Sequence, residues 1–71
     1  MTVIEAFAKN VRIALVEIGW SQKELSERSG ISVATISGML CAHNGPSLHT
    51  AYNIAKTLGK PLDALTKGVD E

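Results

Sequence analysis

The sequence predicts an all-α fold in the form of a compact bundle of five short helices. Apolar residues recur at three- and four-residue intervals along the 71-residue chain, which is the spacing of one helix face. Serines precede several of these stretches and glycines follow them, as N-caps and C-caps do. We expect residues 1–71 to form a single domain, with a core from about residue 3 to 66 and a frayed tail at 67–71.

The first helix is expected from Val3 to Ile18, with Gly19 ending it as a left-handed cap. The residues expected to face the core are Phe7, Val11, Ala14 and Ile18, with Ile4 and Leu15 beside them. Ile13 and Val16 fall on the opposite side of this helix. They are either singly exposed apolar residues, which is the commoner case, or part of a surface for a partner.

The second helix carries two start signals. Ser21 and Glu24 match the S-x-x-E capping box, in which each side chain accepts a hydrogen bond from a free backbone N–H. Trp20 and Leu25 stand where a hydrophobic staple packs across the helix start. The helix is therefore expected from Gln22 to Ser29.

Three further helices follow. Ser32 is an N-cap for a third helix that is expected to continue to about Ala42. Ser47 caps a fourth helix, which Gly59 ends, and Pro61 in a first turn opens a short fifth one. The inward residues expected in the last two helices are Leu48, Ala51, Ile54, Ala55, Leu58, Leu62 and Leu65.

Helices two and three form a recognisable motif. Two short helices joined by a tight, glycine-containing turn are the signature of a helix-turn-helix. Gly30 supplies the permissive backbone of the turn, and Ser26 supplies a small side chain where the two helices approach most closely. The apolar seam between them is expected to consist of Leu25, Ile31, Ile36 and Met39.

The motif and the segments after it resemble the Cro/CI (XRE-type) family of phage and bacterial regulators. The segments that carry the resemblance are GWSQKELS (19–26), GIS (30–32), TIS (35–37), PSL (46–48), IAK (54–56), LG (58–59) and LD (62–63). They occur in the family's order and spacing over nearly the whole chain. The resemblance implies a lambda-repressor-like DNA-binding domain.

The resemblance also implies a function and a site. It implies a sequence-specific, repressor-like transcriptional regulator that binds a double-stranded DNA operator as a homodimer, with its third helix in the major groove. Base-facing residues would be Ser32, Val33, Ala34 and Ser37. Backbone contacts would come from Ser21, Gln22, Lys23, Thr35, His43 and Asn44. By the same resemblance, helices four and five and the tail would be the dimer surface. Tyr52 in the fourth helix is expected to be either a partly buried packing residue or part of a dimer surface.

The sequence departs from the family at the third helix. Its outward arc has none of the Gln, Arg, Lys or Asn residues with which many relatives contact bases, so we expect modest specificity based on thymine methyls and DNA shape. Gly38 within this helix suggests a close approach to another group. Leu15 and Leu40 replace an Arg–Glu pair of many relatives, and such an apolar replacement of a buried ion pair is often neutral or stabilising.

Composition bounds the other function classes. The formal net charge is +0, so DNA binding cannot depend on overall charge. Cys41, His43 and His49 fall short of the four ligands of a structural zinc site, and no catalytic set can be assembled, so we expect neither metal, cofactor nor enzymatic activity.

The same features predict a location and leave one alternative function. One cysteine, no signal peptide and no membrane-spanning stretch indicate a protein of the bacterial cytoplasm, associated with the nucleoid when bound to DNA. The alternative is a helix-turn-helix fold used as a protein-interaction module, or as an antitoxin with weak DNA binding.

Overall fold

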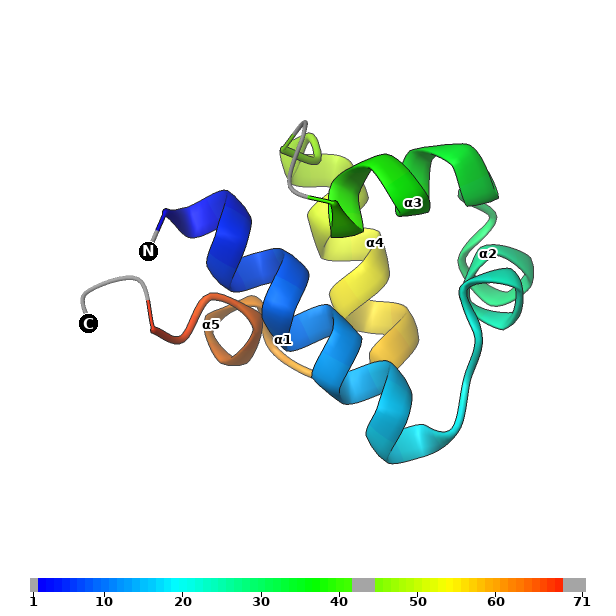
Figure 1. The fold of residues 1–71 in the computed structure, drawn as a ribbon, viewed down its shortest axis with the longest axis horizontal. Coiled ribbons are helices and arrows are strands. Elements are labelled where there is room, and N and C mark those ends of the chain that lie inside the picture. Colours follow the sequence, from blue (N-terminus) through cyan, green and yellow to red (C-terminus); the bar gives the residue numbers. More distant parts are fainter. Residues whose placement is uncertain (1, 42–44, 69–71) are drawn as a thin grey trace.

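Five helices make up the part of the chain that the computed structural model describes, residues 2–41 and 45–68 (Figure 1). They are α1 (Val3–Ile18), α2 (Gln22–Ser29), α3 (Val33–Leu40), α4 (Leu48–Leu58) and α5 (Leu62–Leu65). No strand occurs in these two ranges. The all-α fold and the order of its helices are therefore as the sequence predicts.

The helix boundaries follow from their caps. The hydroxyls of Ser21, Ser32 and Ser47 each accept a hydrogen bond from the backbone N–H three residues later. Left-handed glycines end α1, α2 and α4. Thr2 and Glu5 form a complete capping box at the start of α1, which the sequence analysis did not identify.

A single cluster of apolar side chains forms the core. Leu25, Ile36 and Ile54 are fully buried and come from α2, α3 and α4. The other buried members are Phe7, Val11, Leu15, Met39, Leu40, Ala51, Ala55 and Leu65. Trp20, Ile31, Leu58 and Leu62 pack against this cluster while half-buried. The core thus joins all five helices.

The long helix α1 organises the packing. It contacts α3 and α5, whereas α2 contacts α3 and α4. One polar residue of α1, Asn10, holds the end of α5 in place, because its side-chain amide donates to the carbonyl oxygens of Leu65 and Lys67, each at 3.0 Å. In Figure 1, α5 lies beside the N-terminal half of α1. Helix α3 lies on the opposite side of the molecule from α5.

Several expectations about element ends are wrong. Ile18 and Leu48 do not face the core but are 43% and 78% exposed. Both lie at a helix end, where no element within residues 2–41 and 45–68 extends far enough to cover them. Helix α3 ends at Leu40 instead of about residue 42, and Pro61 is the N-cap of α5 instead of a residue of its first turn.

The second helix also differs from expectation in one contact. Ser21 accepts from the Glu24 backbone as predicted, but the Glu24 carboxylate does not reach back to the Ser21 N–H. It accepts instead from Arg28 Nε at 2.8 Å. This is an i, i+4 ion pair within α2, so the Glu24 carboxylate is engaged with Arg28 and does not complete the capping box.

Candidate nucleic-acid interface

The third helix turns one face to the core and the other to solvent. Ile36, Met39 and Leu40 are buried, in keeping with the predicted seam. On the outward side, Val33 is 43% exposed and Ala34 is exposed, whereas Ser37 and Gly38 are half-buried. Of the four residues expected to face bases, Ser32, Val33 and Ala34 therefore lie at the exposed N-terminal end of α3, whereas Ser37 lies half-buried about one turn further along.

Hydrogen bonds fix the turn that positions α3. Gly30 has φ 77° and ψ 10°, and its N–H donates to the carbonyl oxygen of Ser26 at 2.9 Å. The Ser26 hydroxyl in turn donates to the Ile31 carbonyl oxygen at 2.6 Å, and the Ile31 N–H donates to Ser29 Oγ at 3.2 Å. A small side chain at position 26 is thus required both for space, as predicted, and for this bond.

A residue of α4 completes the support of this turn. Asn53 Nδ2 donates to the Ser29 carbonyl oxygen at 2.9 Å, which joins the last turn of α2 to α4. This role of Asn53 was not predicted from the sequence. The available signal was a polar residue next to the inward apolar residues of α4, where an unpaired amide would be costly.

The N-terminus of α3 has a paired set of hydroxyls. Ser32 Oγ accepts from the Thr35 N–H at 3.2 Å and donates to Thr35 Oγ1 at 2.8 Å. The contact between the two hydroxyls uses one of their two protons, so the pair keeps one hydroxyl proton for a further acceptor. Both residues are exposed.

The start of α2 is the second part of the interface predicted from the sequence. Ser21, Gln22 and Lys23 are all exposed there. Helix starts present backbone N–H groups and a partial positive charge, a combination that suits phosphate oxygens. His43 and Asn44, the remaining predicted contacts, lie outside the described residues.

A shallow hollow adjoins the outward face of α3. It has a volume of about 200 Å³ and is lined by Ala34, Thr35, Gly38, Met39, Gly45 and Pro46. Gly38 borders this space, and a Cβ added to it would meet no other atom within 4 Å. No group of the described structure therefore accounts for the glycine.

Little positive charge is available near this face. Arg28 is engaged elsewhere, since its guanidinium pairs with Glu24 and lies 4.5 Å from the centroid of the Trp20 ring. Lys23 is the basic residue at the start of α2. A ligand of this surface would consequently be held by hydrogen bonds and shape more than by charge.

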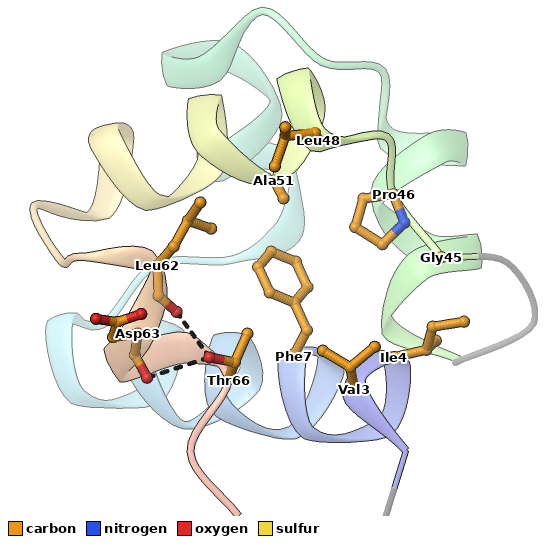
Figure 2. Close-up of a pocket in the computed structure, with 10 residues that line it drawn as sticks. All are labelled: Val3, Ile4, Phe7, Gly45, Pro46, Leu48, Ala51, Leu62, Asp63 and Thr66. Carbon is orange, nitrogen blue, oxygen red and sulfur yellow. Dashed lines mark hydrogen bonds between the residues drawn. The ribbon is translucent and has the colours of Figure 1, made fainter. Parts of the chain in front are cut away.

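A larger apolar cavity lies between α1, α4, α5 and the segment before α4 (Figure 2). Its volume is about 400 Å³, and the Phe7 side chain projects into it between Pro46 and Leu62. Gly45 passes so close to Ile4 that a Cβ at this position would lie 3.0 Å from its side chain. A side chain at position 45 would therefore require a small shift of Ile4, which lines the same cavity.

Residues 2–41 and 45–68 contain neither a candidate metal cluster nor a helix suited to cross a membrane. No group of three or more His, Cys, Asp or Glu side chains there could hold a metal ion. None of the helices described is long and apolar enough to cross a membrane.

Comparison with known proteins identifies the family. A family model described as helix-turn-helix matches residues 11–65, which run from the middle of α1 to the end of α5. No curated protein matches the chain. The match covers well over half of the sequence and includes the motif formed by α2 and α3. The chain therefore belongs to the XRE-type, or Cro/CI-type, helix-turn-helix family of DNA-binding regulators.

Proposed function

We propose that the protein is a repressor-like transcriptional regulator that binds a specific double-stranded DNA operator with α3 in the major groove. The base-facing residues are Ser32, Val33, Ala34 and Ser37. The residues that contact the DNA backbone are Ser21, Gln22, Lys23, Thr35, His43 and Asn44. Neither a cofactor nor a metal takes part.

One observation carries the proposal, namely the support that α3 receives while its outward face stays open. The Ser26–Ile31 and Asn53–Ser29 hydrogen bonds hold the turn, so α3 has a fixed orientation relative to α2 and α4. Its outward face is accessible and has only small side chains. A preorganised helix of this kind can enter a groove without further ordering cost.

The chemistry of the face defines the kind of readout. Val33 and Ala34 offer apolar contacts for thymine methyl groups, and the Ser32–Thr35 pair offers a hydroxyl donor. None of these side chains can make the bidentate contacts with which arginine reads guanine. Part of the specificity then comes from the shape of the DNA.

We further propose that the protein binds DNA as a homodimer with two half-sites about one helical turn apart. Two apolar residues on the outer side of α4 support self-association, because Leu48 is 78% exposed and Tyr52 is 59% exposed. They lie four residues apart and so on one side of the helix.

The test uses a variant with Gln22→Ala and Lys23→Ala, measured on random-sequence duplex DNA at low salt. Because these side chains contact phosphates, the variant should lose DNA affinity to a similar extent on every sequence. The control is Lys67→Ala, which removes an exposed lysine beyond α5 and should leave the affinity unchanged. Equal affinities of the two variants would contradict the proposal.

A second candidate function is a protein-interaction module or an antitoxin with weak DNA binding. The observation in its favour is the absence of charged residues on the outward face of α3 over Val33–Leu40, together with the net charge of +0. Ser37→Arg separates the two functions. It should block a protein that packs against α3, whereas a DNA-binding face would tolerate it or gain affinity from the added charge.

A further inference from the structure

The outer face of α1 has two apolar side chains that no described element covers. Val16 is 81% exposed and Ile13 is 46% exposed, whereas Ala14 and Leu15 between them are buried. The C-terminal half of α1 lies along the lower edge of the molecule in Figure 1, with no other helix below it. Because α1 uses its opposite side to pack against α3 and α5, this face is available to a partner.

Charges of opposite sign flank the apolar pair. Lys9 lies four residues before Ile13 and Glu17 lies four residues after it, so all three share one helix face. Lys9 is exposed, and the Glu17 side chain remains 61% exposed although its carboxylate lies 3.9 Å from Lys60 Nζ. Along the line of Lys9, Ile13 and Glu17 the face therefore reads positive, apolar and negative, and the exposed Arg12 lies at its edge beside Val16.

This order of charges is complementary to itself. If a second helix of the same sequence lies antiparallel on it with Ile13 at the crossing, Lys9 of each copy faces Glu17 of the other. A parallel arrangement would instead place like charges together. A contact related by a two-fold axis requires such a self-complementary surface.

We propose that the outer face of α1, formed by Lys9, Ile13, Val16 and Glu17, is a contact between two copies of this chain. The two α1 helices pack antiparallel about a two-fold axis at Ile13. This contact is separate from the α4 surface with Leu48 and Tyr52, and it does not depend on DNA binding. A single pair of crossing helices buries less surface than stable dimers usually do, so the association is reversible.

The experiment measures self-association of the full chain without DNA by sedimentation equilibrium at concentrations up to the millimolar range. Ile13→Ser should weaken the association by removing the central apolar contact. Lys9→Glu and Glu17→Lys should each weaken it by about tenfold, because each places like charges opposite one another in both symmetric pairs. The double reversal, Lys9→Glu with Glu17→Lys, should restore the original association constant.

Two controls separate this contact from others. Leu48→Ser removes an exposed leucine of the proposed α4 surface, so all the α1 variants are compared in this background, in which the α1-mediated association should persist. Circular dichroism checks that each variant keeps its helical content, which is expected because all four positions are at the surface. Restoration by the double reversal could not result from misfolding.

Three results would overturn the proposal. One is a chain that stays monomeric at millimolar concentration, and another is an association that Leu48→Ser abolishes. The third is an association that neither charge reversal changes. Because no DNA is present, any of these results would leave the proposed DNA-binding function untouched, and a failure to bind DNA would leave this contact untouched.

Discussion

Gly38 lies inside α3, where glycine is about 1 kcal/mol less favourable than alanine. A Cβ at this position would meet no atom within 4 Å. We therefore predict that Gly38→Ala raises the free energy of unfolding by about 1 kcal/mol, measured by urea denaturation. The close approach inferred from the sequence has no counterpart inside the described structure. An external partner such as the proposed DNA is therefore the remaining explanation for this glycine.

The same substitution links stability to binding. If the DNA comes close to Gly38, the added methyl group should lower DNA affinity while it stabilises the fold. A lower stability of Gly38→Ala would contradict the open space beside this residue.

Leu15 and Leu40 are the second feature at this scale. They are 5% and 4% exposed and belong to the same buried cluster. Leu40→Glu should lower the free energy of unfolding by about 3–5 kcal/mol, because it buries a carboxylate that has no partner. Adding Leu15→Arg should recover part of this loss. The control is Leu48→Glu at an exposed position. If Leu40→Glu and Leu48→Glu lowered the free energy of unfolding by similar amounts, the burial of Leu40 would be contradicted.

At the scale of the elements, the capping box of α1 makes the stability of this helix depend on pH. The Thr2 backbone N–H donates to the Glu5 carboxylate at 2.9 Å, and the Thr2 hydroxyl also interacts with Glu5, which holds the pKa of Glu5 below its ordinary value. A lowered pKa in the folded state stabilises the fold above the ordinary pKa, and the stabilisation is lost as the pH falls through the folded value.

We therefore predict that the first turn of α1 loosens on acidification. Amide hydrogen exchange of Glu5 and Ala6 should accelerate as the pH falls through the folded pKa of Glu5, relative to the intrinsic exchange rates. Glu5→Gln removes the titrating group and should abolish this extra pH dependence. An NMR titration that gives Glu5 an ordinary or raised pKa would contradict the prediction.

The serine-capped starts and the glycine-capped ends of the helices were predictable from sequence because they depend on local chemistry. Ser21, Ser32 and Ser47 cap helices through their own next turn, which requires no knowledge of the rest of the fold. Ile18 and Leu48 show the limit of this reasoning. Helical spacing indicates which residues share a face, but not how far the neighbouring helix extends along it.

The supports of α3 were predictable only in part. A small residue at position 26 follows from the close approach of α2 and α3, but its hydrogen bond to Ile31 depends on the conformation of the turn. The bond from Asn53 to Ser29 joins residues 24 positions apart and exists only after α4 packs against α2. The exposed positions of Val33 and Ala34 followed from helix periodicity, whereas Ser32 was placed at this face by the family resemblance alone.

At the scale of the whole molecule, charge is balanced, with 7 basic and 7 acidic residues. Lys23 is the basic group at the proposed DNA face, and Arg28 pairs with Glu24. Each neutralised phosphate contributes about −0.9 to the slope of log affinity against log salt, so we predict a slope shallower than about −3 per protomer. Fluorescence anisotropy over a range of salt concentrations measures it. A much steeper slope would mean that further basic residues, such as Lys9, Arg12 or Lys56, contact the DNA.

The most direct test of DNA reading by α3 is selection of binding sites from a random duplex library at low and at physiological salt. We predict that this selection enriches an inverted repeat, with half-sites about one helical turn apart and thymines opposite α3. Enrichment of strictly required guanines opposite α3 would contradict the proposed readout. No enrichment even at low salt, from a protein that is folded, would contradict DNA reading itself and favour the protein-interaction function.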